Sequence, residues 1–125
     1  MNNTQHHIST IPFQEILVPV NRQLIAISFM NIVMLEAADD YIKIHTTALS
    51  NPYLIKGCLK KAEQLLPPSS FCRVHRSYIV GVRHVRIITR DTVNLGTKEV
   101  PLSKNYAAGL RSRFVAPTSF YATGE

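Results

Sequence analysis

FCRVHRSYIVGV, residues 71–82, is the stretch around which the rest of the chain is organised. Because β-branched and aromatic residues favour strands, residues 71–74 and 78–82 are predicted to form two short strands. The polar side chains of His75, Arg76 and Ser77 then lie where one strand ends and the next begins. Arg and His supply positive charge and planar donors, which suit phosphates, carboxylates or base edges. The alternative is a structural turn whose polar side chains bond the neighbouring backbone.

Positive charge is concentrated in the part of the chain that contains this stretch. The whole chain has a net charge of +6, but residues 71–113 contain nine basic and two acidic side chains and carry +7, whereas the remaining residues carry −1. A basic region rich in arginine is the electrostatic footprint of a protein that binds a polyanion. A solvated basic face without a partner is the alternative.

Length and composition describe one globular domain. With 125 residues, of which 46% are hydrophobic and 18% charged, the chain can form one core. No apolar run approaches the roughly 20 residues of a transmembrane helix, and the N-terminus lacks the pattern of a secretion signal. We therefore expect a cytoplasmic protein that does not insert directly into a membrane. Cys58 and Cys72 are too few for a disulfide scaffold and are expected to be buried free thiols.

The residues before this stretch predict two hairpins, a short strand and a helix. Two-residue polar breaks at Asn21-Arg22 and Asp39-Asp40 are typical of hairpin turns. Apolar residues at spacings of three and four predict a helix over residues 57–66, which Pro67-Pro68 ends. The expected apolar face consists of Cys58, Leu59, Ala62, Leu65 and Leu66. The expected strands are 15–20, 23–27, 32–38, 41–46 and 53–56, with a turn or single helical turn at 28–31.

After this stretch, the pattern predicts another hairpin, a last strand and a last helix. The hairpin consists of residues 83–89 and 92–95 around Arg90-Asp91, and the strand follows at 99–102. Ser103 is a plausible N-cap for a helix through Phe114. We expect a flexible arm or linker at 1–13, one domain at 14–114 and a disordered tail at 115–125.

The chain has no recognisable enzyme signature. It lacks a Walker loop, a dinucleotide-binding glycine motif, a zinc-protease motif and a serine-hydrolase elbow. Asp39 and Asp40 are adjacent on a predicted hairpin, where neighbouring side chains point to opposite faces, so they favour a turn over a pair of catalytic carboxylates. Cys72 and His75 alone are too few for a zinc site. We therefore expect no catalytic residue, no metal and no cofactor.

A nucleic acid is the polyanion that fits best. Arg76 can contact a guanine edge with two hydrogen bonds, and His75, Ser77 and Lys104 can reach phosphates. A mainly β chain lacks the two consecutive helices of a helix-turn-helix. The aromatic residues are scattered, which favours the grooves of a duplex over stacking on single-stranded bases. A small basic RNA-binding or ribosome-associated protein is the alternative.

Three blocks of sequence resemble the LytTR DNA-binding domain of bacterial transcription regulators. The first is IVMLEA at residues 32–37 with YIKI at 41–44, and the second is FCRVHRSYIV at 71–80. The third is VPLSKNY at 100–106, and the resemblance covers residues from about 14 to 114. It implies a mainly β, elongated fold of about ten short antiparallel strands in small sheets, with one or two short helices. It also implies that loops, and not a recognition helix, enter successive major grooves.

The resemblance further implies roles for particular residues. By position, Lys43, Arg76 and Lys104 would contact bases, and Asp40, Arg73, His75, Ser77 and Ser103 would make phosphate or supporting contacts. Apolar side chains of Cys72, Val74, Ile79 and Val80 would anchor the arginine. Two positions depart from the family pattern: Asp39-Asp40 stands where Gly-Asn is frequent, and Gly81 where Asn is frequent.

The resemblance to this family also implies several binding partners. They commonly bind paired repeat sites on double-stranded DNA as homodimers, and an upstream sensor kinase or membrane partner would supply the signal. A receiver domain usually precedes the DNA-binding domain, and residues 1–13 are too short to be one. The chain is therefore expected to be either a stand-alone regulator or a fragment of a longer one.

Overall fold

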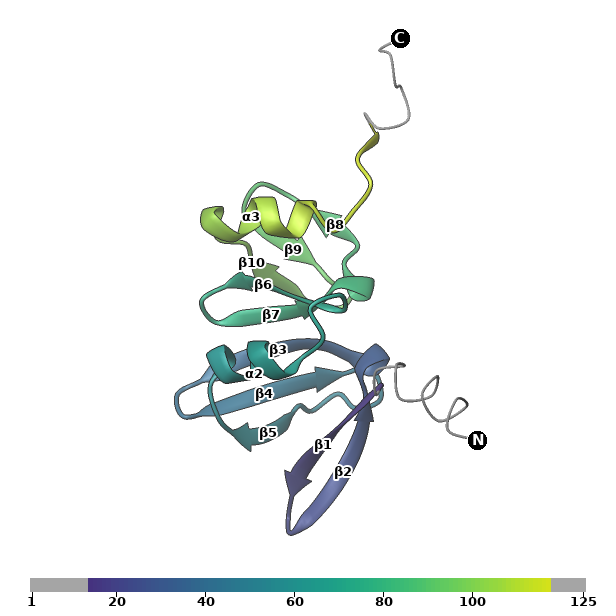
Figure 1. Ribbon diagram of the computed structural model, residues 1–125, viewed down its shortest axis with the longest axis vertical. Helices are drawn as coiled ribbons and strands as arrows, with labels where there is room; N and C mark the ends of the chain where they lie inside the picture. Colours follow the sequence, from purple (N-terminus) through teal and green to yellow (C-terminus); the bar gives the residue numbers. More distant parts are fainter. Residues whose placement is uncertain (1–13, 118–125) are drawn as a thin grey trace, which may run out of the picture.

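Ten strands in three antiparallel sheets form the framework of the structure, a computed structural model that describes residues 14–117 (Figure 1). The prediction of a mainly β, elongated fold is confirmed. The three sheets have the strand orders β1-β2, β10-β9-β8 and β5-β4-β3-β7-β6. In chain order the elements are β1 (Glu15–Val20), β2 (Gln23–Ser28), η1 (Phe29–Asn31), β3 (Ile32–Ala38), β4 (Tyr41–Thr46), β5 (Tyr53–Lys56), α2 (Leu59–Leu65), β6 (Phe71–His75), β7 (Tyr78–Gly81), η2 (Val82–His84), β8 (Ile87–Ile88), β9 (Thr92–Asn94), β10 (Glu99–Pro101) and α3 (Lys104–Arg111).

The five-stranded sheet separates two hydrophobic cores. Side chains of successive strand residues point to opposite faces, so β6 and β7 can contribute to both cores. One core joins the sheet to the β1–β2 hairpin and α2, and consists of Val18, Ile27, Ile32, Leu35, Ile42, Ile44, Leu59, Leu66, Phe71 and Ile79. The other joins it to α3 and the three-stranded sheet, and consists of Val33, Met34, Cys72, Val74, Val80, Val93, Leu95, Val100, Leu102, Ala107 and Leu110.

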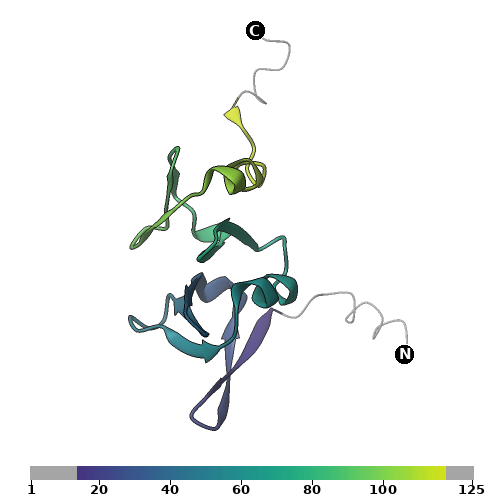
Figure 2. The same ribbon diagram turned by 90° about the vertical axis from the view of Figure 1, so that its left-hand side faces the viewer.

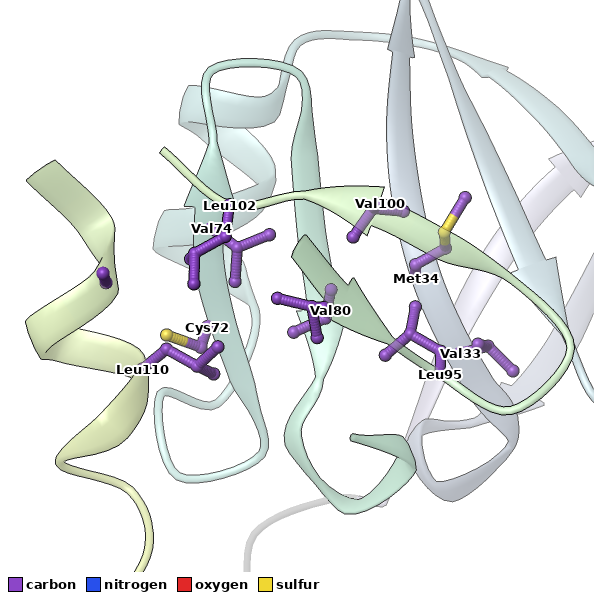
Figure 3. Close-up of a cluster of buried hydrophobic side chains, with 11 residues drawn as sticks. Val33, Met34, Cys72, Val74, Val80, Leu95, Val100, Leu102 and Leu110 are labelled. Carbon is purple, nitrogen blue, oxygen red and sulfur yellow. The ribbon is translucent and has the colours of Figure 1, made fainter. Parts of the chain in front are cut away.

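The second core fixes α3, and Leu102 just after β10, against β6. Figure 3 shows Leu110 of α3 facing Cys72, and Leu102 facing Val74. Val74, Val80 and Leu110 are fully buried. The burial predicted for Cys72, Val74, Ile79 and Val80 is confirmed.

A bulge interrupts the pairing of β6 with β7 just before their turn. Arg73 is opposite Ile79 and His75 is opposite Tyr78, so Val74 is the extra residue. A bulge bends the strand and re-aims the side chains that follow it. Here Val74 points into the core, and the turn residues Arg76 and Ser77 come immediately after the bend.

Gly81 allows β7 to approach β3 closely. A Cβ atom at residue 81 would lie 2.5 Å from the carbonyl oxygen of Ile32 and 3.1 Å from Cδ2 of His84. The His84 ring is itself fixed, because its Nε2 lies 2.7 Å from the carbonyl oxygen of Met30. The glycine is therefore required by space and not by an unusual φ angle.

The two hairpins predicted before residue 71 are confirmed, including both two-residue turns. Asn21 and Arg22 have φ angles of 50° and 66°, as a type I′ turn requires. Asp39, at the first turn position between β3 and β4, has a φ of 57°. Aspartate tolerates this left-handed region better than most residues do.

Three sequence predictions are wrong in detail. Residues 83–89 do not form one strand, because residues 82–84 make a 3-10 turn closed by the Val85 N–H bond to the Val82 carbonyl, and β8 contains only Ile87 and Ile88. The last helix ends at Arg111, where Ser112 caps it, and Phe114 is 41% exposed. Within the shorter α2, Leu65 is 78% exposed, because Leu59 and Leu66 occupy the buried side.

Cys58 also departs from its prediction. It lies just before the first turn of α2 and is exposed, whereas Cys72 is buried as expected. The arm predicted at 1–13, and residues 118–125 of the predicted tail, lie outside the described residues. Neither helix in residues 14–117 has the length and hydrophobicity that a membrane crossing requires.

Candidate nucleic-acid interface

Two turns and the start of α3 lie along one edge of the molecule. They are the β3–β4 turn, the β6–β7 turn and the first residue of α3, on the left in Figure 1 and facing the viewer in Figure 2. We call this edge the tip edge and define it by Asp40, Lys43, His75, Arg76, Ser77, Ser103 and Lys104. It contains seven of the eight site residues predicted from sequence.

Backbone hydrogen bonds tie the three parts of the tip edge together. The Ala37 N–H of β3 donates to the Ser77 carbonyl at 2.9 Å, and the Ser103 N–H donates to the Val74 carbonyl at 2.8 Å. The β3–β4 turn is tied in the same way, since the Gly57 N–H donates to the Asp40 carbonyl at 2.9 Å. The relative positions of the turns therefore depend on main-chain atoms and not on the exposed side chains.

Arg76 lies in the β6–β7 turn of the tip edge. It is exposed, and within residues 14–117 its guanidinium makes no hydrogen bond or ion pair. A guanidinium presents donors in a rigid, planar fork that matches phosphate or guanine. The side chain is free to bind a partner.

Arg73, the eighth predicted residue, braces the turn from behind. Its Nε donates to the His75 carbonyl at 2.8 Å, and its Nη2 donates to the Arg76 carbonyl at 2.6 Å. Its Nη1 donates to Oε1 of Glu63 on α2 at 2.9 Å. The Arg73 side chain is only 15% exposed. All three nitrogens are occupied, which fits the supporting role better than a phosphate contact.

His75 fixes the other side of the same turn. Its Nδ1 accepts a hydrogen bond from the Ser77 N–H at 3.0 Å, which places the ring proton of a neutral imidazole on Nε2. The ring also lies against Tyr78, with centroids 5.5 Å apart. The turn backbone is thus held by two side chains of β6.

Lys43 and Lys104 place two further cations near this turn. Lys104 is exposed at the first residue of α3, and Lys43 is half-buried on β4. Glu36 is opposite Lys43 in the sheet, but its Oε1 lies 3.0 Å from Nε2 of His45. Neither lysine forms an ion pair within the described residues. Ser103 is the N-cap residue of α3 by position, although its side chain makes no capping hydrogen bond.

The basic residues of the C-terminal part do not form one continuous face. Arg76 precedes β7, whereas Arg83 and Arg86 follow it and therefore lie beyond the opposite end of that strand. Arg86 donates to the carbonyls of Arg83 and Val85, which shapes the loop there. Net charge counted along the sequence therefore overstated the charge at the tip edge.

Within residues 14–117, the structure shows neither a group of metal ligands nor an activated thiol at this edge. Among residues 14–117, no three His, Cys, Asp or Glu side chains are grouped so as to hold a metal ion. Burial raises the pKa of the Cys72 thiol, an effect larger than the opposing attraction of Arg113. A thiol with a raised pKa is a poor nucleophile at neutral pH.

Glu63 is the site residue that sequence reasoning missed. It lies on the exposed side of α2, and nothing in a local pattern connects it with Arg73 ten residues later. Its effect on the turn is visible only in the folded chain.

Comparison with known proteins identifies the family. The family profile of the LytTr DNA-binding domain matches residues 22–114, most of the described chain. The chain belongs to the LytTr DNA-binding domain family. A solved LytTr DNA-binding domain from a Bacillus cereus response regulator has the same fold, with a TM-score of 0.68 and 29% identity over 82% of this chain and 97% of that one.

Curated relatives of this LytTr domain are longer proteins. The sensory transduction protein LytT of Bacillus cereus is 30% identical over 118 residues, which cover 86% of this chain and 47% of LytT. The Bacillus subtilis LytT is 28% identical over 98 residues, 74% of this chain and 40% of that protein. The CO-responsive transcriptional regulator RcoM of Rhodospirillum rubrum is 42% identical over 55 residues, 44% of this chain and 22% of RcoM. The chain spans about half the length of the LytT relatives or less.

Proposed function

We propose that the tip edge reads the sequence of duplex DNA and that the chain thereby regulates transcription in the cytoplasm. Arg76 and Lys104, with Lys43 beside them, contact bases from turns that enter successive major grooves. Asp40, His75, Ser77 and Ser103 contact phosphates or support the turns, and Arg73 supports the β6–β7 turn. No enzymatic step belongs to this function.

The main support for this proposal is that unpaired basic side chains are attached to a backbone held in place by hydrogen bonds. Arg76 and Lys104 are exposed and have no partner within residues 14–117, whereas the backbone beneath them is held by the Ala37–Ser77 and Ser103–Val74 hydrogen bonds. Base reading needs side chains held in register, because phosphate contacts position a protein whereas base contacts specify the sequence. The turns of the tip edge provide such positions without a recognition helix.

Further partners follow from the same proposal. Two copies bind paired repeat sites as a homodimer, and an upstream sensor kinase or membrane partner supplies the signal. The LytT relatives, named as sensory transduction proteins, support this view.

Selection of bound duplexes from a random library tests the proposal and yields the target site. The selected duplex should bind at least about 10³-fold more tightly than random duplex or RNA at physiological salt. Arg76→Ala should cost about 1–3 kcal/mol of binding free energy and relax preference at one base pair. The matched control is Arg83→Ala. Arg83 is exposed and lies beyond the other end of β7, so this substitution should leave base preference unchanged. Equal affinity for the selected duplex, random duplex and RNA would contradict the proposal.

A further inference from the structure

The β1–β2 hairpin exposes an apolar face at the end of the molecule farthest from α3 (Figure 1). Its inner side packs on the domain through Val18 and Ile27. On the outer side, Leu17 is 59% exposed and Leu24 is 66% exposed, next to exposed Pro19 and Ala26. The register places Leu17 opposite Ala26 and Pro19 opposite Leu24, so these four side chains lie on one face. Contiguous exposed apolar residues mark interaction surfaces.

The backbone of β2 offers an open edge beside this face. Among the described residues, β2 pairs only with β1. The pair Val20–Gln23 closes a two-residue turn and bonds across it, so the N–H and C=O groups of Leu24 and Ala26 point outward from the hairpin. Natural edge strands avoid pairing with other chains through proline or charge. Pro19 protects β1 in this way, whereas β2 contains neither proline nor a charged residue.

We propose that β2 pairs antiparallel with β2 of a second copy of this chain, about a two-fold axis at Ile25. This register places Leu24 opposite Ala26 of the second copy, and it joins the two apolar faces into one. The contact is isologous, so each bond or packed pair occurs twice. The inference deepens the homodimer of the proposed function, and rests on that function for its role, but it concerns the chain in the absence of DNA.

Charge complementarity favours a second copy as the occupant. Residues 14–28 contain only two charged side chains, Glu15 at the base of the hairpin and Arg22 at its tip. Both are exposed, and neither forms an ion pair within the described chain. In the proposed register Arg22 lies opposite Ser28 of the second copy, the residue that is paired with Glu15 in the hairpin. Each tip cation therefore lies close to the carboxylate at the base of the other hairpin.

The same arrangement keeps the basic parts of two copies apart. The hairpin has no net charge, whereas residues 71–113 carry +7. Contact through the hairpins brings together the least charged ends of two molecules, which limits their repulsion. It also leaves the tip edge uncovered, because that edge lies along the side of the molecule (Figure 2).

Sedimentation of the full chain over a range of concentrations tests this contact. The wild-type chain should dimerise reversibly, and Leu24→Lys should raise the dimer dissociation constant roughly 10-fold or more, because the two-fold contact carries the substitution twice. Leu65→Lys changes a leucine on α2 that is more exposed than Leu24, and as the matched control it should leave the constant unchanged. Far-UV circular dichroism checks that each variant is folded.

Charge reversal tests the register. Arg22→Glu should weaken the dimer several-fold, and adding Glu15→Arg to the same chain should restore it, since each end then regains an opposite charge. Three results would each overturn the inference: a wild-type chain that is monomeric at every concentration, equal weakening by Leu65→Lys and Leu24→Lys, and a double reversal no stronger than the single one.

Binding to a duplex with one copy of the selected site separates this inference from the proposed function. Leu24→Lys should bind that single site as the wild type does, because the hairpin lies away from the tip edge. A dimer without sequence preference would refute the proposed function alone. Sequence-specific binding by a strictly monomeric chain would refute the hairpin contact alone.

Discussion

Replacing Arg73 with methionine removes the brace behind the β6–β7 turn while keeping the unbranched aliphatic part of the side chain. The Nε bond to the His75 carbonyl is part-buried, and a hydrogen bond from a charged donor contributes about 1.5–3 kcal/mol. The bond to the Arg76 carbonyl is exposed, and Glu63 is 49% exposed, so together they add about 1 kcal/mol after solvent screening. We therefore expect the free energy of unfolding to fall by about 2–4 kcal/mol.

Urea denaturation followed by far-UV circular dichroism measures this loss, since the chain has no tryptophan to report it. The control is Arg76→Met, which removes an exposed guanidinium without a partner in residues 14–117 and should change the free energy of unfolding by less than about 0.5 kcal/mol. Binding to the selected duplex is then compared at several salt concentrations. Arg73→Met should weaken binding without changing the salt dependence, because a brace neutralises no phosphate.

The opposite pattern would refute the assignment of Arg73 as a brace. A phosphate contact at Arg73 predicts that Arg73→Met lowers the slope of log affinity against log salt by about 0.9. The same role predicts unchanged stability. A variant as stable as the wild type with such a reduced slope would move Arg73 from the support of the turn to the DNA interface.

Two further predictions concern packing and thiol chemistry. Gly81→Ala should lower the free energy of unfolding by about 1–3 kcal/mol, because the new Cβ meets the Ile32 carbonyl at 2.5 Å. Gly109→Ala, where a Cβ meets nothing within 4 Å, should instead raise it by up to about 1 kcal/mol through helix propensity, and urea denaturation of both variants would expose an error if they behave alike. A thiol reagent at neutral pH should modify Cys58 rapidly in the folded chain and Cys72 only after unfolding, because Cys72 is buried and its pKa is raised. Rapid modification of both thiols in the folded chain would contradict the described core.

The hairpins could be predicted because their signals are local. Asn21-Arg22 and Asp39-Asp40 are two-residue polar breaks between alternating runs, and such breaks specify a turn without distant contacts. The exposure of Cys58 and Leu65 could not be predicted in this way. Helical spacing placed both residues on the expected apolar face. Only the packing of α2 on the sheet decides which of the apolar positions on that face are buried.

Some features of the tip edge could be predicted from local sequence, and others could not. The position of Arg76 in a turn was predicted, because a polar cluster between two strands is visible in a dozen residues. The hydrogen bonds that brace this turn were not predicted, since Glu63 and Arg73 lie on different elements and meet only after folding. The net charge of residues 71–113 also did not show that Arg76 and Arg83 lie in different places. The two residues are close in sequence, but the four-residue strand β7 separates them in the structure.

The main-chain bonds beneath the tip edge have a consequence for how this domain can change its target. The Ala37–Ser77 and Ser103–Val74 hydrogen bonds involve no side chain, so any residue other than proline at the donor positions preserves them. Arg76 and Lys104 are exposed, where substitutions usually alter the free energy of unfolding by no more than about 0.5 kcal/mol. Under the base-reading roles proposed for Arg76 and Lys104, new specificities would therefore arise one residue at a time, without compensating mutations in the core.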